Sequence, residues 1–348
     1  MYASKRYTNW SPSLQTGFGG VGKDFLHPAV LQLGLRYAEG SIVGGTNRTL
    51  ALMATLKTVI EQLSEDGCDT QLRTLLKQVV DKNVQFLVTC RPLAVGMGNA
   101  IREFKNEIEK FHKSTPNATF EYAKSYFRDI CSSYMKEKCS LAVDAIVPLA
   151  CSKINDGDVI VTYGYSSIIL QTFRYAAEKQ SKRFRVVVVD SFPRFEGRKL
   201  LEALSAAGIP CTYLFINAAA YMMREASKVM IGAAGVRANG SVSSRCGTAS
   251  VCMMAHYYRV PVMVLCQTFK FTESVLLDSF CDNEIGDPED VVAVSTPGMP
   301  SLLKDWRTTR STLNVRACMQ AIAASHNKSA GPQPHLRHRL RPRRDVGH

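Results

Sequence analysis

The spacing of apolar residues predicts two domains of different construction. From residue 28 to residue 149 the apolar positions recur with the 3.6-residue period of amphipathic helices and almost never alternate as in a strand. Helices are expected to begin at Pro28 and again after the Gly44-Gly45 break, and to occupy residues 71–87, 95–111 and 120–149. The sequence therefore predicts a helical domain over residues 26–150.

A second pattern follows the turn sequence NDGD at residues 155–158. Short β-branched and apolar runs alternate there with helical segments of roughly ten to fifteen residues. The runs are VIVTYG (159–164), RVVVVDS (185–191), CTYLFI (211–216), KVMIGA (228–233) and VMVLCQT (262–268). Because each crossover between parallel strands has to cover one face of the sheet, residues 151–290 are predicted to form a Rossmann-like, doubly wound parallel-sheet α/β domain.

The two ends of the chain follow neither pattern. Residues 1–25 are rich in Ser, Gly, Thr and Asn without a period, so we expect a flexible arm. Residues 291–348 finish in Arg-, His- and Pro-rich sequence with little to bury, which predicts a divergent, largely disordered basic tail. One helix is expected within residues 305–324 of this tail.

Most of the positive net charge of the chain lies in the tail. The formal charge is +13, but residues 301–348 hold ten Lys and Arg against two Asp, which is +8 of that total. The remaining body is close to neutral and carries no basic stripe interleaved with aromatic residues. We therefore expect a solvated tail and no specific nucleic-acid partner, while nucleic-acid binding through the tail is the alternative.

Hydropathy and cysteine usage bear on the compartment. No apolar run reaches the ~18 to 20 residues of a membrane-spanning helix, and the first residues lack an apolar secretory segment. The eleven cysteines are odd in number and form no C-x-x-C pair, so we expect small buried thiols rather than a disulfide scaffold. These features predict a cytosolic protein without a membrane partner.

Candidate binding chemistry lies just after the predicted strands, where open parallel sheets bind ligands. The segment YGYSS (163–167) opens a helix, whose first amides suit an anion; a tight turn with Ser166 as N-cap is the alternative. The segment RANGSVSSRCGT (237–248) offers Asn239 and Gly240 for a turn, several hydroxyls and Arg245. This cluster is a candidate phosphate site.

A complete catalytic set is missing from these strand ends. Cys246 has no nearby histidine, and His256 falls within a predicted helix. Asp190 suits either a ribose hydroxyl or a helix cap. No Cys/His set or pair of clustered aspartates has metal-ligand spacing, so we expect neither a metal nor a cofactor.

Several segments resemble the delta subunits of eukaryotic translation initiation factor 2B. They include HPAVLQLGLRYAEGSIVGGTNRTLALM (27–53), CRPLAVGMGNAI (90–101), DVIVTYGYSS (158–167), FRVVVVDSFPRFEGRKLLEAL (184–204), CTYLFINAAAYMM (211–223), SKVMIGAAGVRANGSVSSRCGTA (227–249) and the region from Val260 to Asp290. The likeness implies a non-catalytic regulatory subunit of a guanine-nucleotide exchange complex. Its implied partners are the beta, alpha, gamma and epsilon subunits and initiation factor 2, including its phosphorylated alpha subunit.

The helical half is implied to sense the phosphorylated partner. Since a phosphoserine loop brings nearly two negative charges, basic side chains are the natural contacts. The candidates by charge are Lys105, Lys113, Lys124, Arg128 and Lys136, for each of which a solvated helix face is the alternative.

The family is also similar to sugar-phosphate isomerases, such as the ribose-1,5-bisphosphate and methylthioribose-1-phosphate enzymes. On their motifs, T-H-C-N and A-N-G-D, the catalytic Cys and Asp positions are Gly164 and Ser241 here. Neither residue can replace a thiolate or a carboxylate in proton transfer, so no catalytic residue is expected. The likeness implies a vestigial phosphate pocket made of Arg91, Tyr165, Ser166, Asn239, Gly240 and Arg245; pairing of Arg91 with an acidic residue, and a working isomerase, are the alternatives.

The resemblance fails at the end of the chain. Delta subunits continue with a Y-D-x-T-P-P motif and a closing stretch that completes the sheet, whereas Arg-, His- and Pro-rich sequence follows Asn314 here. An incomplete sheet would expose an edge strand, so the divergent end of the chain is expected to affect assembly and solubility.

Overall fold

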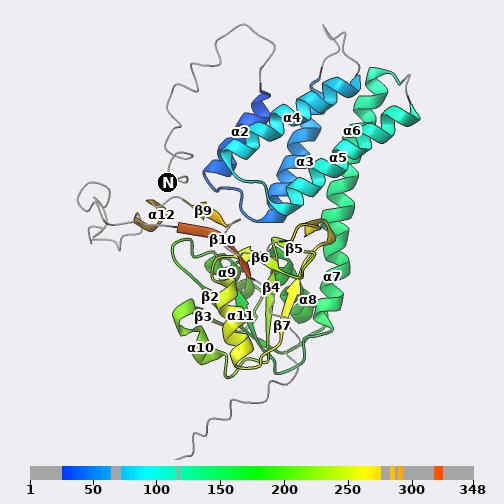
Figure 1. Ribbon diagram of the computed structural model, residues 1–348. Coiled ribbons are helices and arrows are strands. Elements are labelled where there is room, and N and C mark those ends of the chain that lie inside the picture. Colours follow the sequence, from blue (N-terminus) through cyan, green and yellow to red (C-terminus); the bar gives the residue numbers. More distant parts are fainter. Residues whose placement is uncertain are drawn as a thin grey trace, which may run out of the picture.

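The computed structural model describes residues 26–63, 72–115, 118–275, 283–286, 289–292 and 317–323. A bundle of helices stands on an α/β domain, and one long helical segment joins the two (Figure 1). The predicted arm over residues 1–25 and most of the predicted tail lie outside the described residues. Within the described part no helix is long and apolar enough to cross a membrane.

The bundle contains the helices that the apolar period predicts. They are α2 (Pro28–Ala38), α3 (Gly45–Glu61), α4 (Leu72–Cys90), α5 (Val95–Ser114) and α6 (Phe120–Tyr134). Pro28 starts α2, where its missing N–H costs nothing, and Gly44 precedes α3 with a φ of 88° that favours glycine. Apolar faces of all five helices meet in one core that includes Tyr37, Phe104 and Phe127.

The connection to the α/β domain is helical throughout. A π-helical segment, η1 (Met135–Leu141), follows α6 directly and leads into α7 (Ala142–Cys151). Ala150 and Cys151 at the end of α7 pack in the core of the α/β domain against α8 (Ser167–Glu178) and α9 (Gly197–Ala206). The last turn of the connecting helix therefore belongs to both domains, and the boundary at residue 150 stays a prediction.

The main sheet is parallel in the order β3-β2-β1-β4-β7. Its strands are β1 (Val159–Tyr163), β2 (Arg185–Asp190), β3 (Cys211–Phe215), β4 (Lys228–Gly232) and β7 (Val262–Leu265). Val161 of β1 aligns with Val187 of β2 on one side and Val229 of β4 on the other. The central strands β1, β2 and β4 are apolar and mostly buried because helices cover both faces.

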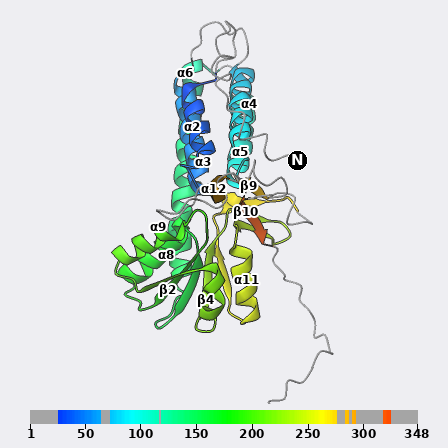
Figure 2. The same ribbon diagram turned by 90° about the vertical axis from the view of Figure 1, so that its left-hand side faces the viewer.

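The two faces of this sheet carry different helices. Side chains of α7, α8 and α9 cover one face, and those of α10 (Ala219–Met222) and α11 (Thr248–Tyr257) cover the other. Figure 2 shows α8 and α9 on one side of the sheet and α11 on the opposite side. The predicted doubly wound arrangement is confirmed.

A second, mixed sheet was not predicted. It has the order β8-β5-β6-β10-β9, formed by β5 (Gly235–Arg237), β6 (Val242–Arg245), β8 (Phe271–Thr272), β9 (Glu284–Gly286) and β10 (Ala317–Ala323). The Gly/Ser-rich segment that we interpreted as a phosphate-binding turn is therefore a hairpin, whose strands pair antiparallel through Gly235 and Ser243.

Strand β10 corrects the prediction for the tail. Residues 317–323 were expected to be disordered or helical, but they pair antiparallel with β6 and with β9. The sequence ACMQAIA carries no clear strand period, and both of its partners lie far away in the chain, so only tertiary pairing makes it a strand.

Candidate functional site

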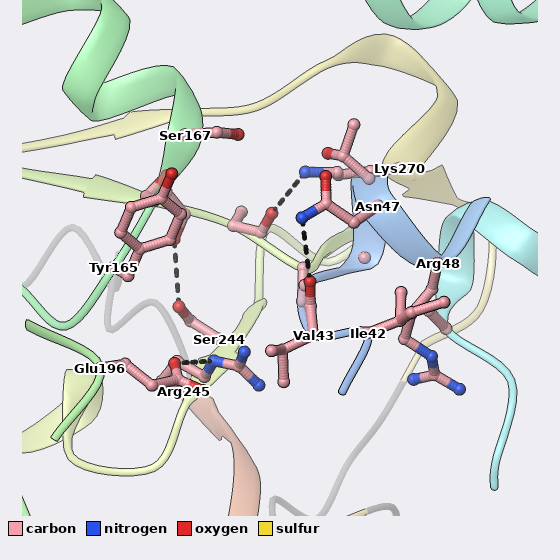
Figure 3. Close-up of a pocket in the computed structure, with 18 of the residues that line it drawn as sticks. Ile42, Val43, Asn47, Arg48, Tyr165, Ser167, Glu196, Ser244, Arg245 and Lys270 are labelled. Carbon is pink, nitrogen blue, oxygen red and sulfur yellow. Dashed lines mark hydrogen bonds and ion pairs between the residues drawn. The ribbon is translucent and has the colours of Figure 1, made fainter. Parts of the chain in front are cut away.

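A cavity of about 470 Å³ lies where the helical bundle meets the α/β domain. The bundle contributes Ser41–Arg48, which lead into α3, together with Arg91 and Ala94. The α/β domain contributes the carboxyl ends of β1 and β4, the first turn of α8, β6 and Lys270 of the short 3-10 helix η3 (Thr268–Lys270). Figure 3 shows these side chains converging from both domains. This position matches the general rule for ligand sites in open parallel sheets.

Three helices begin at the wall of this cavity. Residues of the first turn of α3, residues 166 and 167 at the start of α8, and Thr248 at the start of α11 all line it. No side chain caps any of these three N-termini through a hydrogen bond. Because the first amides of a helix lack intrahelical acceptors and carry the positive end of its dipole, the three starts together favour an anion.

The charged side chains of the cavity are mostly cationic. Among the described lining residues Glu196 is the single carboxylate, and it pairs with Arg245 at 2.8 Å. The lining cations are Arg48, Arg91, Lys199, Arg245 and Lys270. The cavity is therefore electropositive even after the pairing of Arg245.

Arg48 and Lys270 are buried cations whose partners are carbonyls. Lys270 is 6% exposed and donates from Nζ to the Ala233 carbonyl at 3.1 Å. Burial lowers the pKa of Lys270. Arg48 is 3% exposed and donates to the Pro92 carbonyl, and its Nε has no partner among the described residues. Burial, with a contribution from Arg91, lowers the pKa of Arg48 to about 10. An anion bound in the cavity would offset the free-energy cost of burying these two positive charges.

Arg91 takes the structural role that we left open as an alternative. It lines the cavity, yet its Nε donates to Glu284 of β9 at 2.5 Å, and both side chains are buried. The pairing with an acidic residue is confirmed. Its Nη1 is buried and has no hydrogen-bond partner among the described residues.

The other predicted pocket residues divide into two groups. Tyr165, Ser166 and Arg245 line the cavity, and Ser166 occupies the N-cap position of α8, although its side chain makes no capping hydrogen bond. Asn239 and Gly240 are exposed and absent from the lining. They form the tip of the β5–β6 hairpin, where Gly240 has a φ of 78°, and the hairpin carries them away from the sheet ends.

The positions implied to have been catalytic are also outside the lining. Gly164 has a φ of 60° at the end of β1, and the Ser241 hydroxyl donates to Oδ1 of Asn239 at 2.7 Å within the hairpin turn. Nearby, Tyr163 places its hydroxyl against the Ser191 hydroxyl, at 2.6 Å, and the Cys246 carbonyl. Burial raises the pKa of Tyr163 to about 12, so this phenol stays neutral.

Sequence reasoning missed the contribution of residues 41–48 to the cavity. The Gly44-Gly45 pair, which the sequence analysis interprets as a helix boundary, places the start of α3 at the wall of the cavity. A Cβ added to Gly45 would lie 3.9 Å from Cε of Lys270. Lys270 follows β7 by five residues, so the rule that ligands bind at strand ends does select it.

The basic residues proposed to face a phosphorylated partner lie apart from the cavity. Lys105 pairs with Asp81, Lys124 donates to the Leu63 carbonyl at 3.1 Å, and Arg128 is 3.4 Å from Asp129. Lys113 and Lys136 are exposed. Within the described ranges, no group of three or more His, Cys, Asp or Glu could hold a metal ion.

A family model decides the relationship. Residues 41–308 match the model described as the initiation factor 2 subunit family, and this range includes the α/β domain and the helical domain from α3 onwards. The chain belongs to this family. Two relatives are similar over most of the chain: translation initiation factor eIF2B subunit delta from Dictyostelium discoideum is 40% identical over 295 residues, and that from Schizosaccharomyces pombe is 36% identical over 294 residues.

The matched region is a large part of this chain and a smaller part of those relatives. It covers 83% and 84% of the chain, but 46% and 62% of the two delta subunits. Ribose 1,5-bisphosphate isomerase from Pyrococcus furiosus is 32% identical over 212 residues, which cover 60% of the chain and 63% of the enzyme. The chain is therefore similar both to translation factor subunits and, over a shorter region, to an isomerase.

Solved structures agree with this placement. A chain of the tetrameric eIF2B-beta2-delta2 complex from C. thermophilum matches with a TM-score of 0.74 at 30% identity, covering 86% of this chain and 89% of that chain. The eIF2B beta subunit from Chaetomium thermophilum has the same fold, with a TM-score of 0.57 at 22% identity over 72% of this chain and 79% of that chain.

Proposed function

We propose that this chain is a delta-type, non-catalytic regulatory subunit of the translation initiation factor 2B exchange complex. Its role would be to assemble with the beta, alpha, gamma and epsilon subunits and to contact initiation factor 2, including the phosphorylated alpha subunit. The observation that carries this proposal is the match of both domains to delta subunits, at 36–40% identity over more than four fifths of the chain.

The cavity supports a role without catalysis. An isomerase needs groups that move a proton between neighbouring carbons, and these must face the substrate. The described lining holds no cysteine, and its one carboxylate, Glu196, is engaged by Arg245. Gly164 and Ser241, which stand at the implied catalytic positions, offer no acid or base. These contacts argue against the isomerase alternative.

Co-expression with the other four subunits tests the proposed function. We expect the full chain to co-purify with them as one complex, and the purified chain to show no turnover of ribose 1,5-bisphosphate. A ribose 1,5-bisphosphate isomerase assayed in parallel is the positive control. Failure to associate with any of the four subunits, or turnover comparable to that of the control enzyme, would overturn the proposal.

We further propose that the cavity keeps an affinity for phosphate groups. Arg91, Tyr165, Ser166 and Arg245 line it as the resemblance implies, and the starts of α3, α8 and α11 add helix N-termini that no side chain caps. Lys270 supports this proposal most, because it is a buried cation that donates to a backbone carbonyl and forms no ion pair with a described carboxylate. The ligand would carry a phosphate monoester.

Substitution of Lys270 tests this affinity. We expect Lys270→Met to weaken binding of ribose 5-phosphate by roughly tenfold or more, since a charge-assisted hydrogen bond is lost, and Lys270→Arg to recover part of it. Isothermal titration calorimetry measures the change, and Lys110→Met, at an exposed lysine of α5, is the control. Binding by the native chain that is undetectable, or unchanged in Lys270→Met, would contradict the proposal.

A further inference from the structure

The cavity has two chemically different ends. Figure 3 shows Lys270 and Asn47 beside the start of α3 at one end, and Glu196 and Arg245 at the other. Lys270 is a buried cation that pairs with no described carboxylate, so the first end offers positive charge and hydrogen-bond donors to one phosphate group. The second end differs because it holds Glu196, the single carboxylate of the described lining.

Glu196 is held in place by packing and by charge. It directly precedes α9 but does not cap that helix, and its Oε2 forms an ion pair with Nε of Arg245 at 2.8 Å. Gly197 allows the start of α9 to pack closely, since a Cβ added there would lie 2.8 Å from Cγ of Asp190. Asp190 itself is buried and accepts a hydrogen bond from the Tyr213 hydroxyl at 2.9 Å. The carboxylate of Glu196 is therefore a fixed part of the cavity wall.

The ion pair removes the charge that would attract a second phosphate. Glu196 and Arg245 are 19% and 23% exposed, so water screens their charges only in part. A phosphate at this end would have to displace Glu196 from Arg245 or lie beside its negative charge, and both cost free energy. Lys199 also lines the cavity, but its side chain is exposed, so water and salt screen its charge. The described lining thus favours one phosphate over two.

The same end is suited to hydroxyl groups. A carboxylate has about four acceptor sites, so the ion pair leaves Glu196 able to accept further hydrogen bonds. The Ser244 hydroxyl donates to the Gly232 carbonyl at 3.0 Å, and its own oxygen can still accept. Acidic residues accept hydrogen bonds from ribose hydroxyls in the same way in dinucleotide-binding sheets. One end of the cavity therefore offers donors to a phosphate, and the other offers acceptors to hydroxyls.

We propose that Glu196 is a specificity-determining residue that restricts the cavity to ligands with one phosphate group and neighbouring hydroxyls. This inference rests on the proposed phosphate affinity of the cavity and adds the class of ligand, a sugar or other polyol that carries a single phosphate monoester. Bisphosphates are disfavoured by the negative charge of Glu196. Charge rather than size decides, because a cavity of about 470 Å³ lies within the range of sites for drug-sized ligands.

Two sugar phosphates that differ by one phosphate group test the inference. Isothermal titration calorimetry compares ribose 5-phosphate with ribose 1,5-bisphosphate on the full chain and on Glu196→Gln, which removes the charge but keeps the size. We expect the native chain to bind the monophosphate roughly tenfold more tightly or better, and Glu196→Gln to reduce this preference by roughly tenfold, because the repulsion is gone and Arg245 is freed. Glu202→Gln, at an exposed residue of α9 outside the lining, is the matched control and is expected to keep the native preference.

The outcomes separate this inference from the proposed function. The comparison on the native chain needs no variant, and a native preference for the bisphosphate would overturn the inference. An unchanged preference in a folded Glu196→Gln, checked by circular dichroism, would also overturn it, because Glu196 would then be a structural residue only. In both cases the phosphate affinity stands. If the native chain binds neither sugar phosphate, the proposed phosphate affinity fails and this inference fails with it, whereas co-purification with the other subunits is a separate result.

Discussion

Replacing Arg91 by Leu is expected to lower the free energy of unfolding by about 3 to 5 kcal/mol. The Arg91–Glu284 pair is buried, with side chains that are 3% and 8% exposed, and it joins residues 193 positions apart. Loss of the guanidinium leaves a buried carboxylate without its partner, and that uncompensated charge is the main cost. Urea unfolding followed by circular dichroism measures the change.

Two further variants identify the cause. The double variant Arg91→Leu/Glu284→Leu is expected to recover much of the lost stability, because it removes the orphaned charge together with the pair. Arg174→Leu, which breaks an exposed pair with Glu178 on α8, is expected to cost less than about 1 kcal/mol. A loss in Arg91→Leu no larger than in Arg174→Leu would show that the buried pair contributes little.

Replacing Gly247 by Ala is expected to destabilise the chain by about 2 to 4 kcal/mol, from backbone strain and overpacking together. Gly247 has a φ of 99° just before α11, a conformation that L-residues rarely adopt. An added Cβ would also meet the Tyr163 hydroxyl, and would approach its Cζ to 2.6 Å and Ile216 Cδ1 to 3.0 Å. Thermal unfolding measures the loss.

A second glycine separates the two contributions. Gly157 has a φ of 81°, but nothing lies within 4 Å of the position of an added Cβ. Gly157→Ala is therefore expected to cost only the backbone strain, about 1 to 2 kcal/mol. Equal losses in the two variants would mean that Tyr163 moves aside freely. A larger loss in Gly247→Ala would show that the start of α11 is held by packing against β1.

The main architecture could be predicted because its signals are local. A 3.6-residue period over segments of ten to twenty residues, and β-branched runs such as Val186–Val189, reflect burial that each element imposes on its own sequence. The second sheet gave no such signal. Its strands have two to seven residues, and β6 gains its partner β10 from about seventy positions further along the chain.

The candidate site was only partly predictable for a related reason. Ser166, Tyr165 and Arg245 follow or lie beside strands, so the rule that ligands bind at strand ends was sufficient to select them. The same rule selected Asn239 and Gly240, which the β5–β6 hairpin carries away from the cavity. No sequence rule pointed to the start of α3, because its position at the cavity depends on how the two domains pack.

The amino-acid sequence by itself determined the helical bundle, the parallel sheet with two covered faces, and the family, because period and motif are properties of neighbouring residues. The tertiary structure alone decided the pairing of Arg91 with Glu284, the convergence of three helix starts with Lys270, and the pairing of Glu196 with Arg245. Each of these depends on distances between residues that are remote in the chain, which are fixed only when the two domains and the second sheet pack together.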